Sequence, residues 1–161
     1  MNHATPSGAW CTFRLAGNCY ALPVEQVQEV LRPAPITRVP MAAPAIRGLL
    51  HLRGAIVTVL DLAQVLGLPT CDDRARPHIV VRDGERSVSL LVDAIGDVQR
   101  HAIENIQPSP GTLSAAIRQL VTGAIPQPHE LLLVLQLEPV LQRAFEPQGG
   151  PERREDAREC A

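Results

Sequence analysis

Two segments of the sequence resemble each other, and this internal repeat is the feature that most constrains the fold. GLLHLRGAIVTVLDLAQVL at residues 48–66 matches GAIPQPHELLLVLQLEPVL at residues 123–141, with a leading glycine and apolar positions in step. Upstream of these, VEQVQEV at 24–30 matches VDAIGDV at 92–98. The two matches lie 75 and 68 positions apart, so the order of elements occurs twice. This order predicts two similar β-subdomains packed against each other.

The strands within the repeat are apolar almost throughout. A strand with one face in water alternates apolar and polar residues, whereas AIVTVLDL and LLLVLQL hardly alternate. Both faces of these strands should therefore be covered. A closed barrel covers the inner face and a neighbouring barrel covers part of the outer one. Aromatic residues make up only 2% of the chain, so aliphatic side chains must form the core of a mainly β fold with short helices.

Turn and helix signals divide the chain further. The stretch PVEQVQEVLR places apolar residues at helical spacing between Pro23 and Pro33, which predicts a helix over residues 24–31. DLAQVLGL predicts a short helix that begins after Asp61 as its N-cap and ends at Gly67. Hairpin turns are predicted at Gly17-Asn18, Arg53-Gly54 and Asp83-Gly84.

The ends of the chain differ in composition from its middle. Residues 1–9 and 146–161 combine polar, Pro and Gly residues with little to bury, so we expect two disordered tails around one domain at 10–145. The start of the chain has no signal-peptide pattern. The longest clean apolar run, LLLVLQL, is far shorter than the about 20 residues of a membrane helix. We therefore expect a cytoplasmic protein that does not insert into membranes.

The sequence offers no set of residues for catalysis. No serine stands in a nucleophile-elbow context, no histidine or cysteine pair has metal-ligand spacing, and no lysine exists for a phosphate loop. We expect no enzyme activity, no catalytic or metal-ligating residue and no cofactor. The net charge of −2 and the scattered arginines argue against nucleic-acid binding. A small barrel that binds peptides or nucleic acid, and a small hydrolase, stay open as alternatives.

Two charged residues stand beside strongly apolar positions. Glu29 ends the Val-rich stretch and Arg53 lies at the bend of a hairpin. An unpaired charge in such a place is costly, so we expect the carboxylate and the guanidinium to pair beside an exposed apolar patch that includes Val27. The planar fork of arginine suits a recognition surface. The alternative is two separate solvated charges.

The combination of these segments resembles the bacterial CheW-like chemotaxis adaptor family. The resemblance rests on YALPVEQVQEVLR, ITRVP, IRGLLHLRGAIVTVLDL and HIVVRDGERSVSLLVDAIGDV, and it extends over about residues 10–145. It implies two packed SH3-like five-stranded barrels and a non-enzymatic coupler. The partners it implies are the cytoplasmic tip of a chemoreceptor and the regulatory domain of a CheA-type histidine kinase. Receptor contact in the family uses the groove between the barrels. The positions that match the family motif, and thus the candidate partner contacts, are Val27, Glu29, Gly48 and Arg53.

The sequence departs from the family pattern in several places. Thr58 stands where proline is usual, Ala63 where arginine is usual, and His51 where asparagine is usual. Pro126 and Pro128 fall in the last hairpin bend, which predicts a looser loop there. These departures suggest a divergent coupler, with a pilus, twitching or surface-sensing pathway as the alternative setting.

Overall fold

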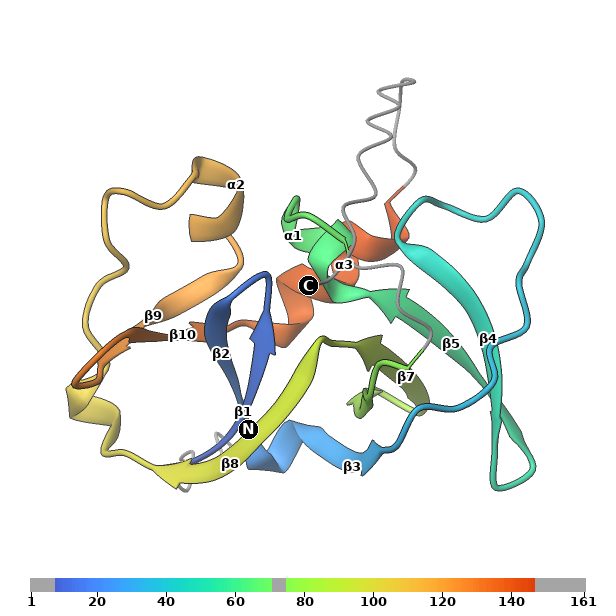
Figure 1. Ribbon diagram of the computed structural model, residues 1–161, viewed down its shortest axis with the longest axis horizontal. Coiled ribbons are helices and arrows are strands. Elements are labelled where there is room, and N and C mark those ends of the chain that lie inside the picture. The colour runs from blue at the N-terminus through green and yellow to red at the C-terminus, as the bar shows by residue number, and fades with distance from the viewer. Residues whose placement is uncertain (1–7, 71–74, 147–161) are drawn as a thin grey trace.

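Two five-stranded sheets lie side by side in the computed structural model, which describes residues 8–70 and 75–146 (Figure 1). Barrel A has the strand order β8-β1-β2-β10-β9, and barrel B has the order β3-β6-β7-β5-β4. Each sheet is mixed, because β10 runs parallel to β2 and β5 runs parallel to β7. The strands are β1 (Ala9–Leu15), β2 (Asn18–Pro23), β3 (Val27–Leu31), β4 (Ile46–Leu52), β5 (Ala55–Asp61), β6 (His78–Asp83), β7 (Arg86–Leu91), β8 (Ala94–Arg100), β9 (Val121–Pro126) and β10 (Leu131–Leu135). The helices are η1 (Val24–Gln26), α1 (Leu62–Leu66), η2 (Ile103–Asn105), α2 (Ala115–Arg118) and α3 (Leu137–Phe145).

A backbone bridge closes each sheet into a barrel. Thr37, which follows β3, exchanges two hydrogen bonds of 2.8 Å with Leu49 on β4. Gln107, which follows β8, exchanges two hydrogen bonds of 2.8 Å with Ala124 on β9. In both sheets the bridge joins the segment after one edge strand to the other edge strand, so the chain closes across the open side of the sheet. The prediction of a mainly β fold built from two packed five-stranded barrels is confirmed.

The two sequence repeats exchange strands to form the barrels. Barrel A combines the β1–β2 hairpin of the first repeat with β8, β9 and β10 of the second, and barrel B combines β3, β4 and β5 with the β6–β7 hairpin. The two sheet orders are therefore the same order of equivalent strands. The bulges agree as well, since Arg47 on β4 and Thr122 on β9, 75 positions later, are each the extra residue in their hairpin. The sequence repeat is therefore present in the structure, but each barrel contains strands from both copies of the repeat.

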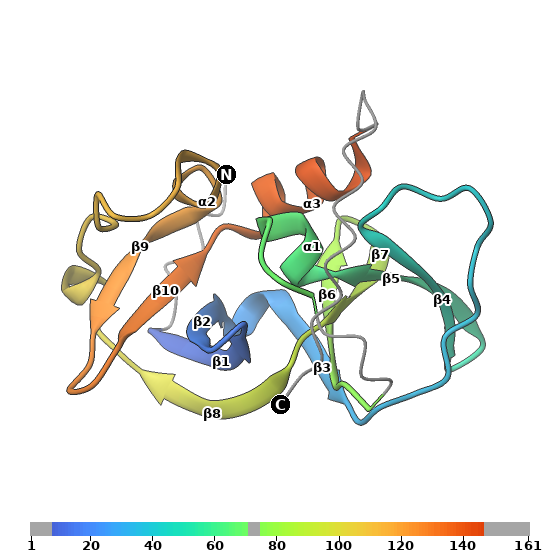
Figure 2. The ribbon, with the colours of Figure 1, turned by 45° about the horizontal axis from the view of Figure 1, so that its top comes forward.

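Buried apolar residues form three groups. The largest takes side chains from both barrels and from α1 and α3, and includes the stacked rings of Phe13 and Tyr20, whose centroids are 6.1 Å apart. A second group around Trp10 belongs to barrel A alone, and a third around Leu50 belongs to barrel B alone. Strands such as β1 contribute to the shared group and to their own barrel's group, which explains why they are apolar on both faces. Figure 2 shows α1 and α3 lying together above the junction of the barrels.

The predicted helix over residues 24–31 is wrong. Only Val24–Gln26 form a single 3-10 turn, and Val27–Leu31 form strand β3, which pairs with β6. Side-chain exposure along β3 alternates, so the relevant period is two and not the helical one. β-Branched valines fit a strand that has a pairing partner, and this tertiary pairing overrides the helical spacing.

Other local predictions have mixed outcomes. The short helix α1 forms as predicted and ends at Gly67, which has a left-handed φ of 71°. The predicted looser loop at Pro126 and Pro128 is wrong, because β9 and β10 pair up to Pro126 and Leu131. Pro126 ends the last strand of its sheet order, where a missing N–H donor is tolerated.

The predicted tails at residues 1–9 and 146–161 lie almost wholly outside the described residues. Strand β1 already begins at Ala9, and α3 ends at Phe145. Within residues 8–70 and 75–146, no helix is long and apolar enough to cross a membrane.

Candidate functional site

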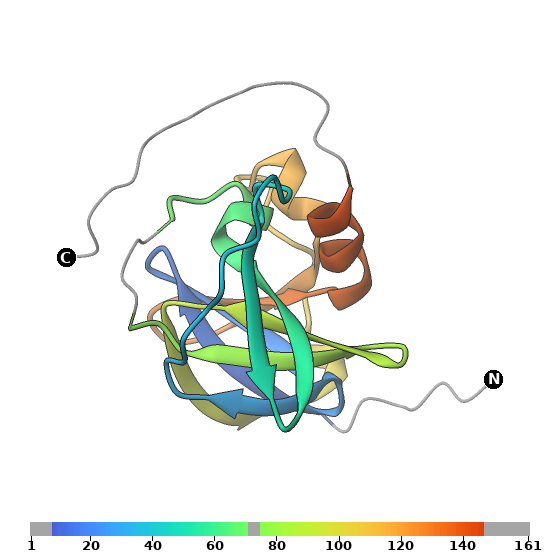
Figure 3. The same cartoon turned by 90° about the vertical axis from the view of Figure 1, so that its right-hand side faces the viewer.

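The Glu29–Arg53 ion pair predicted from the sequence is present. Arg53 Nη2 donates to Glu29 Oε2 at 2.9 Å. Arg53 and Gly54 form the tight turn between β4 and β5 with left-handed φ angles of 51° and 81°. Because β3 and β4 are the two ends of the sheet order, the pair links the two edge strands of barrel B at the tip of this hairpin. Figure 3 views the molecule from the side of barrel B, with the β4–β5 hairpin pointing down.

The two partners of this pair are exposed to very different degrees. The Arg53 side chain is 77% exposed, whereas that of Glu29 is 18% exposed. Glu29 Oε1 is buried, and within the described chain it has no hydrogen-bond partner. A guanidinium has five N–H donors in a fixed fork, so Arg53 can hold Glu29 and still present donors to a carboxylate or carbonyl on another molecule.

Val27 and Gly48 have less exposed positions. Val27 is half-buried and packs against the core shared by both barrels, so it is not the centre of an exposed patch. Gly48 is buried, and a Cβ built there would lie 2.2 Å from the Thr37 carbonyl oxygen. The structure thus gives Gly48 a role in closing the barrel. Contact of either residue with a partner stays a prediction.

Exposed apolar residues occur on η1 and on β3 and β8, the two strands that run along the lower side of the molecule (Figures 1 and 2). Val24 and Val30 flank Val27 and are 36% and 44% exposed, while Ile95 and Val98 on β8 are 36% and 64% exposed. We call these four residues the apolar floor. The sequence analysis did not predict the β8 half of this surface.

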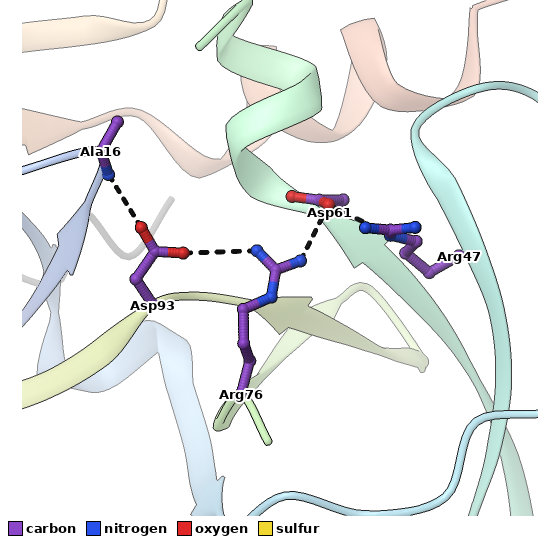
Figure 4. A network of polar contacts seen from close by, with 5 residues as sticks. All are labelled: Ala16, Arg47, Asp61, Arg76 and Asp93. Carbon is purple, nitrogen blue, oxygen red and sulfur yellow. Dashed lines mark hydrogen bonds and ion pairs between the residues drawn. The ribbon is translucent and has the colours of Figure 1, made fainter. Parts of the chain in front are cut away.

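A buried ion-pair network lies where the barrels meet (Figure 4). The Arg76 side chain is 2% exposed, and its two terminal nitrogens bind different carboxylates, Asp61 at 2.9 Å and Asp93 at 3.3 Å. Asp61 also accepts a hydrogen bond from Arg47 Nε at 3.1 Å. Asp93 accepts from the backbone N–H of Ala16 at 2.9 Å. The sequence analysis missed this network, since nothing in the local pattern marks Arg76.

The predicted role of Asp61 as a helix N-cap is only partly right. The residue does precede α1 at the N-cap position, but its side chain makes no capping hydrogen bond. The carboxylate turns instead toward Arg47 and Arg76, and charge-assisted hydrogen bonds of this kind are stronger than a bond to a neutral backbone N–H.

Another buried polar pair lies within barrel B. His78 Nδ1 and Ser89 Oγ are 2.9 Å apart, and both residues are buried. Burial lowers the pKa of His78, and the nearby positive charge of Arg76 lowers it further. In the described parts of the chain, no three His, Cys, Asp or Glu side chains gather as a metal site requires.

Comparisons with known proteins identify the family of this fold. Residues 10–145 match the CheW-like domain. The probable chemotaxis protein CheW of Rhizobium etli is 32% identical over 127 residues, which are 78% of this chain and 82% of that protein. The chain belongs to the CheW-like domain family.

Other members show how widely this likeness extends. The chemotaxis protein CheW of Rhizobium meliloti is 28% identical over 129 residues, 80% of this chain and 83% of that one. Protein PilI of Pseudomonas aeruginosa is 25% identical over 124 residues, 76% of this chain and 70% of that one. The crystal structure of the scaffolding protein TtCheW from Thermoanaerobacter tengcongensis has a TM-score of 0.76 at 25% identity and covers 94% of this chain and 96% of that one. The CheW-like fold therefore accounts for both barrels, and the predicted family resemblance is confirmed.

Proposed function

We propose that this protein is a cytoplasmic adaptor that couples chemoreceptors to a CheA-type histidine kinase. The observation that carries the proposal is the CheW-like match across residues 10–145, together with relatives named chemotaxis protein CheW. An adaptor of this kind acts through binding alone. Its mechanism is to hold two partners at once, which raises the effective concentration of one beside the other.

The Glu29–Arg53 pair is the proposed centre of partner contact. Arginine is enriched among the residues that dominate binding energies at interfaces, and Arg53 is the exposed member of the pair. Glu29 fixes the guanidinium in one orientation, which reduces the entropy lost on binding. Val27 and Gly48 support this corner from the shared core and from the barrel seam.

The apolar floor is the proposed contact for the receptor tip. The exposed valine and isoleucine side chains on η1, β3 and β8 offer apolar surface, and burial of such surface contributes about 25 cal/mol for each Å² removed from water. Because Val30 belongs to barrel B and Val98 to barrel A, a partner lying on the floor contacts both barrels. This arrangement fits the family expectation of receptor contact between the barrels.

Binding assays with matched arginine variants test this proposal. Wild-type protein, Arg53→Ala and Arg14→Ala are titrated separately with a receptor-tip fragment and with the regulatory domain of a CheA-type kinase. Arg14 is the control because it is also an exposed arginine paired with a glutamate, Glu130, but lies on barrel A. We expect Arg53→Ala to weaken binding of at least one partner by about tenfold or more, as loss of about 1.4 kcal/mol requires.

Two outcomes would contradict parts of the proposal. Wild-type protein that binds neither partner at micromolar concentration removes the adaptor role. Arg53→Ala that binds both partners as tightly as Arg14→Ala removes the Glu29–Arg53 corner from the contact surface and leaves the adaptor role to the apolar floor.

A related scaffold role in a pilus or surface-sensing pathway is the second candidate. The likeness to Protein PilI favours it, as do Thr58 and Ala63, which depart from the chemotaxis family pattern. Competition between regulatory domains from kinases of the two pathways decides between them, because the cognate domain binds more tightly.

A further inference from the structure

Apolar residues on the two strands of the apolar floor have a spacing that a regular strand does not explain. Val27 and Val30 on β3 are three positions apart, and so are Ile95 and Val98 on β8. Side chains alternate between the two faces of a strand, so residues three positions apart normally lie on opposite faces. The pairing of the strands shows that each pair lies on one face instead.

The partners of β8 on strand β1 fix the faces in barrel A. Ile95 pairs with Phe13, and residues directly opposite each other in an antiparallel pair lie on the same face. Val98 pairs with Cys11. Both of these β1 residues belong to the core that the two barrels share. Ile95 and Val98 therefore lie on the same face of the sheet, the one turned toward the shared core.

A β-bulge brings both residues to this face. Gly96 and Asp97 together lie opposite the single residue Thr12 of β1, so β8 contains one residue more than its partner strand at this point. The extra residue shifts the alternation by one position, bends the strand and re-aims the side chains that follow. Without the bulge, the spacing of Ile95 and Val98 would place them on opposite faces.

Strand β3 of barrel B has the equivalent bulge. Gln28 and Glu29 together lie opposite Val80 of β6, and each of these three positions differs by 68 from its counterpart at the β8 bulge. Val27 and Val30 pair with residues of β6 that also belong to the shared core, so these two valines share one face as well. Both halves of the floor thus depend on a bulge.

Barrel B holds its bulge by the side chains of the two bulge residues. Ser87 Oγ donates to Gln28 Oε1 at 2.8 Å. Arg53 Nη2 donates to Glu29 Oε2 at 2.9 Å. The residue opposite the bulge, Val80, is apolar and fully buried. The Glu29–Arg53 pair therefore holds the bulge of its own barrel in addition to its proposed role in partner contact.

Barrel A holds its bulge from the opposite strand. Thr12 Oγ1 donates to the Asp97 carbonyl oxygen at 2.6 Å, and Thr12 is only 2% exposed. Thr12 stands at the position equivalent to Val80, so the hydroxyl is the added feature in this barrel. The position equivalent to Arg53 is Pro128, whose side chain has no hydrogen-bond donor. The two barrels thus fasten the same bulge by different side chains.

We infer that Thr12 is a positioning residue for the apolar floor, because its buried hydroxyl holds the β8 bulge in the conformation that aims Ile95 and Val98 together at a partner. The inference rests on the proposed contact of the floor with a receptor tip. Thr12 lies two positions from Trp10 on β1, on the face toward barrel A's own core. It therefore acts through the backbone of β8 and not by contact with the partner.

Titration of a receptor-tip fragment with Thr12→Val tests this inference. Valine keeps the shape of threonine without the donor, and Val80 shows that valine fits the equivalent place in barrel B. Loss of one neutral hydrogen bond lowers the population of the bulge conformation by up to about fivefold, and the apparent Kd rises by the same factor. We expect a rise of about threefold to fivefold. Thr12→Ser keeps the hydroxyl and should bind as the wild type does.

A control and a second variant separate positioning from stability. Val134→Ala removes buried volume from barrel A's own core on β10, away from β1 and β8, and should leave the affinity unchanged. Gly96→Ala attacks the same contact from β8, because a Cβ at Gly96 would overlap Thr12 Oγ1. It should weaken binding as Thr12→Val does, and it replaces Thr12→Val if that variant does not fold.

Relaxation dispersion of the backbone amides at 95–98 tests the bulge in the free protein. We expect flat profiles for the wild type and for Val134→Ala, and microsecond-to-millisecond exchange for Thr12→Val, whose bulge samples a second conformation. This measurement needs no partner. If wild-type protein binds no receptor tip, the adaptor role fails, while the dispersion profiles still decide whether Thr12 holds the bulge.

Three outcomes would overturn the inference. The first is a folded Thr12→Val variant with flat dispersion profiles or with wild-type affinity for a receptor tip that the wild type binds. The second is a Val134→Ala variant that loses as much affinity as Thr12→Val, since general destabilisation then explains both. The third is a Thr12→Ser variant as weak as Thr12→Val, because the hydroxyl is then not the group responsible.

Discussion

Replacement of Gly48 by alanine should destabilise the protein strongly, although a methyl group is a small addition. Gly48 has a φ of 149°, in the region that favours glycine. A Cβ at this position would lie 2.2 Å from the Thr37 carbonyl oxygen and 2.9 Å from the carbonyl carbon. Backbone atoms cannot turn aside as the end of a flexible side chain can, so the Thr37 segment must move away from β4.

The size of this effect follows from what the movement breaks. Thr37 and Leu49 exchange two hydrogen bonds of 2.8 Å, the bridge that closes barrel B. Loss of both costs about 1–3 kcal/mol net at the usual value for a neutral hydrogen bond. Alanine in this backbone conformation adds about 1–3 kcal/mol of strain. We therefore expect the free energy of unfolding to fall by about 2–6 kcal/mol, a large share of the about 5–15 kcal/mol of a typical domain.

The repeat provides an internal comparison for this variant. Gly123 is the equivalent residue in barrel A, and a Cβ there would lie 2.4 Å from the Gln107 carbonyl oxygen. Its φ lies outside the left-handed region, so Gly123→Ala should cost only the bridge, about 1–3 kcal/mol. Gly111→Ala is the control, since a Cβ there meets no atom within 4 Å. Urea unfolding followed by circular dichroism measures all three.

From the most to the least stable variant, the expected order is Gly111→Ala, Gly123→Ala and Gly48→Ala. If Gly48→Ala unfolds at the same urea concentration as Gly111→Ala, the close approach of Thr37 does not constrain this position. The series also separates two explanations of a binding defect. A Gly48 variant should lose binding together with stability, whereas Arg53→Ala should lose binding while the fold survives.

Two further predictions concern buried polar groups. Arg53→Ala leaves the largely buried Glu29 carboxylate without its cation and should lower the free energy of unfolding by about 1–3 kcal/mol. The double variant Arg53→Ala with Glu29→Gln should recover most of this loss, and equal stability of the single and double variants in urea would contradict the prediction. For His78, burial and Arg76 lower the pKa in the folded state, so the unfolded state binds the proton more readily. Stability should therefore be complete above the ordinary value of 6.5 and decline as the pH falls below it, and His78→Asn should flatten this slope in urea unfolding at a series of pH values.

Much of the fold could be predicted because the evidence for it is local or periodic. Strands that are apolar on both faces require cover on both sides, and the repeat predicts two equivalent units. The helix over residues 24–31 was wrong because a spacing of valines fits either period, and only the presence of β6 as a pairing partner decides between them. The strand exchange between repeats could not be predicted either, because equivalent strands have similar sequences and pair equally well within or between repeats.

The candidate site likewise contains one feature that the sequence predicts and one that it does not. The Glu29–Arg53 pair could be predicted because each charge stands in an apolar context that demands a partner. The Arg76 network could not, since its acceptors come from β5 and from the segment between β7 and β8, and Arg76 lies outside any strand. Asp61 was assigned to a helix cap on local grounds, and a buried guanidinium from a distant segment outweighed that local preference.

The strand exchange bears directly on how an adaptor of this kind can transmit a state. Each barrel is completed by a hairpin from the other repeat, so neither barrel can form without the other half of the chain. The largest buried apolar group takes side chains from both barrels, so their packing fixes how one barrel lies against the other. The apolar floor has Val30 on barrel B and Val98 on barrel A, so a partner bound there contacts both barrels. The packing of the shared core therefore determines the shape of this binding surface, although most residues of that core lie outside it.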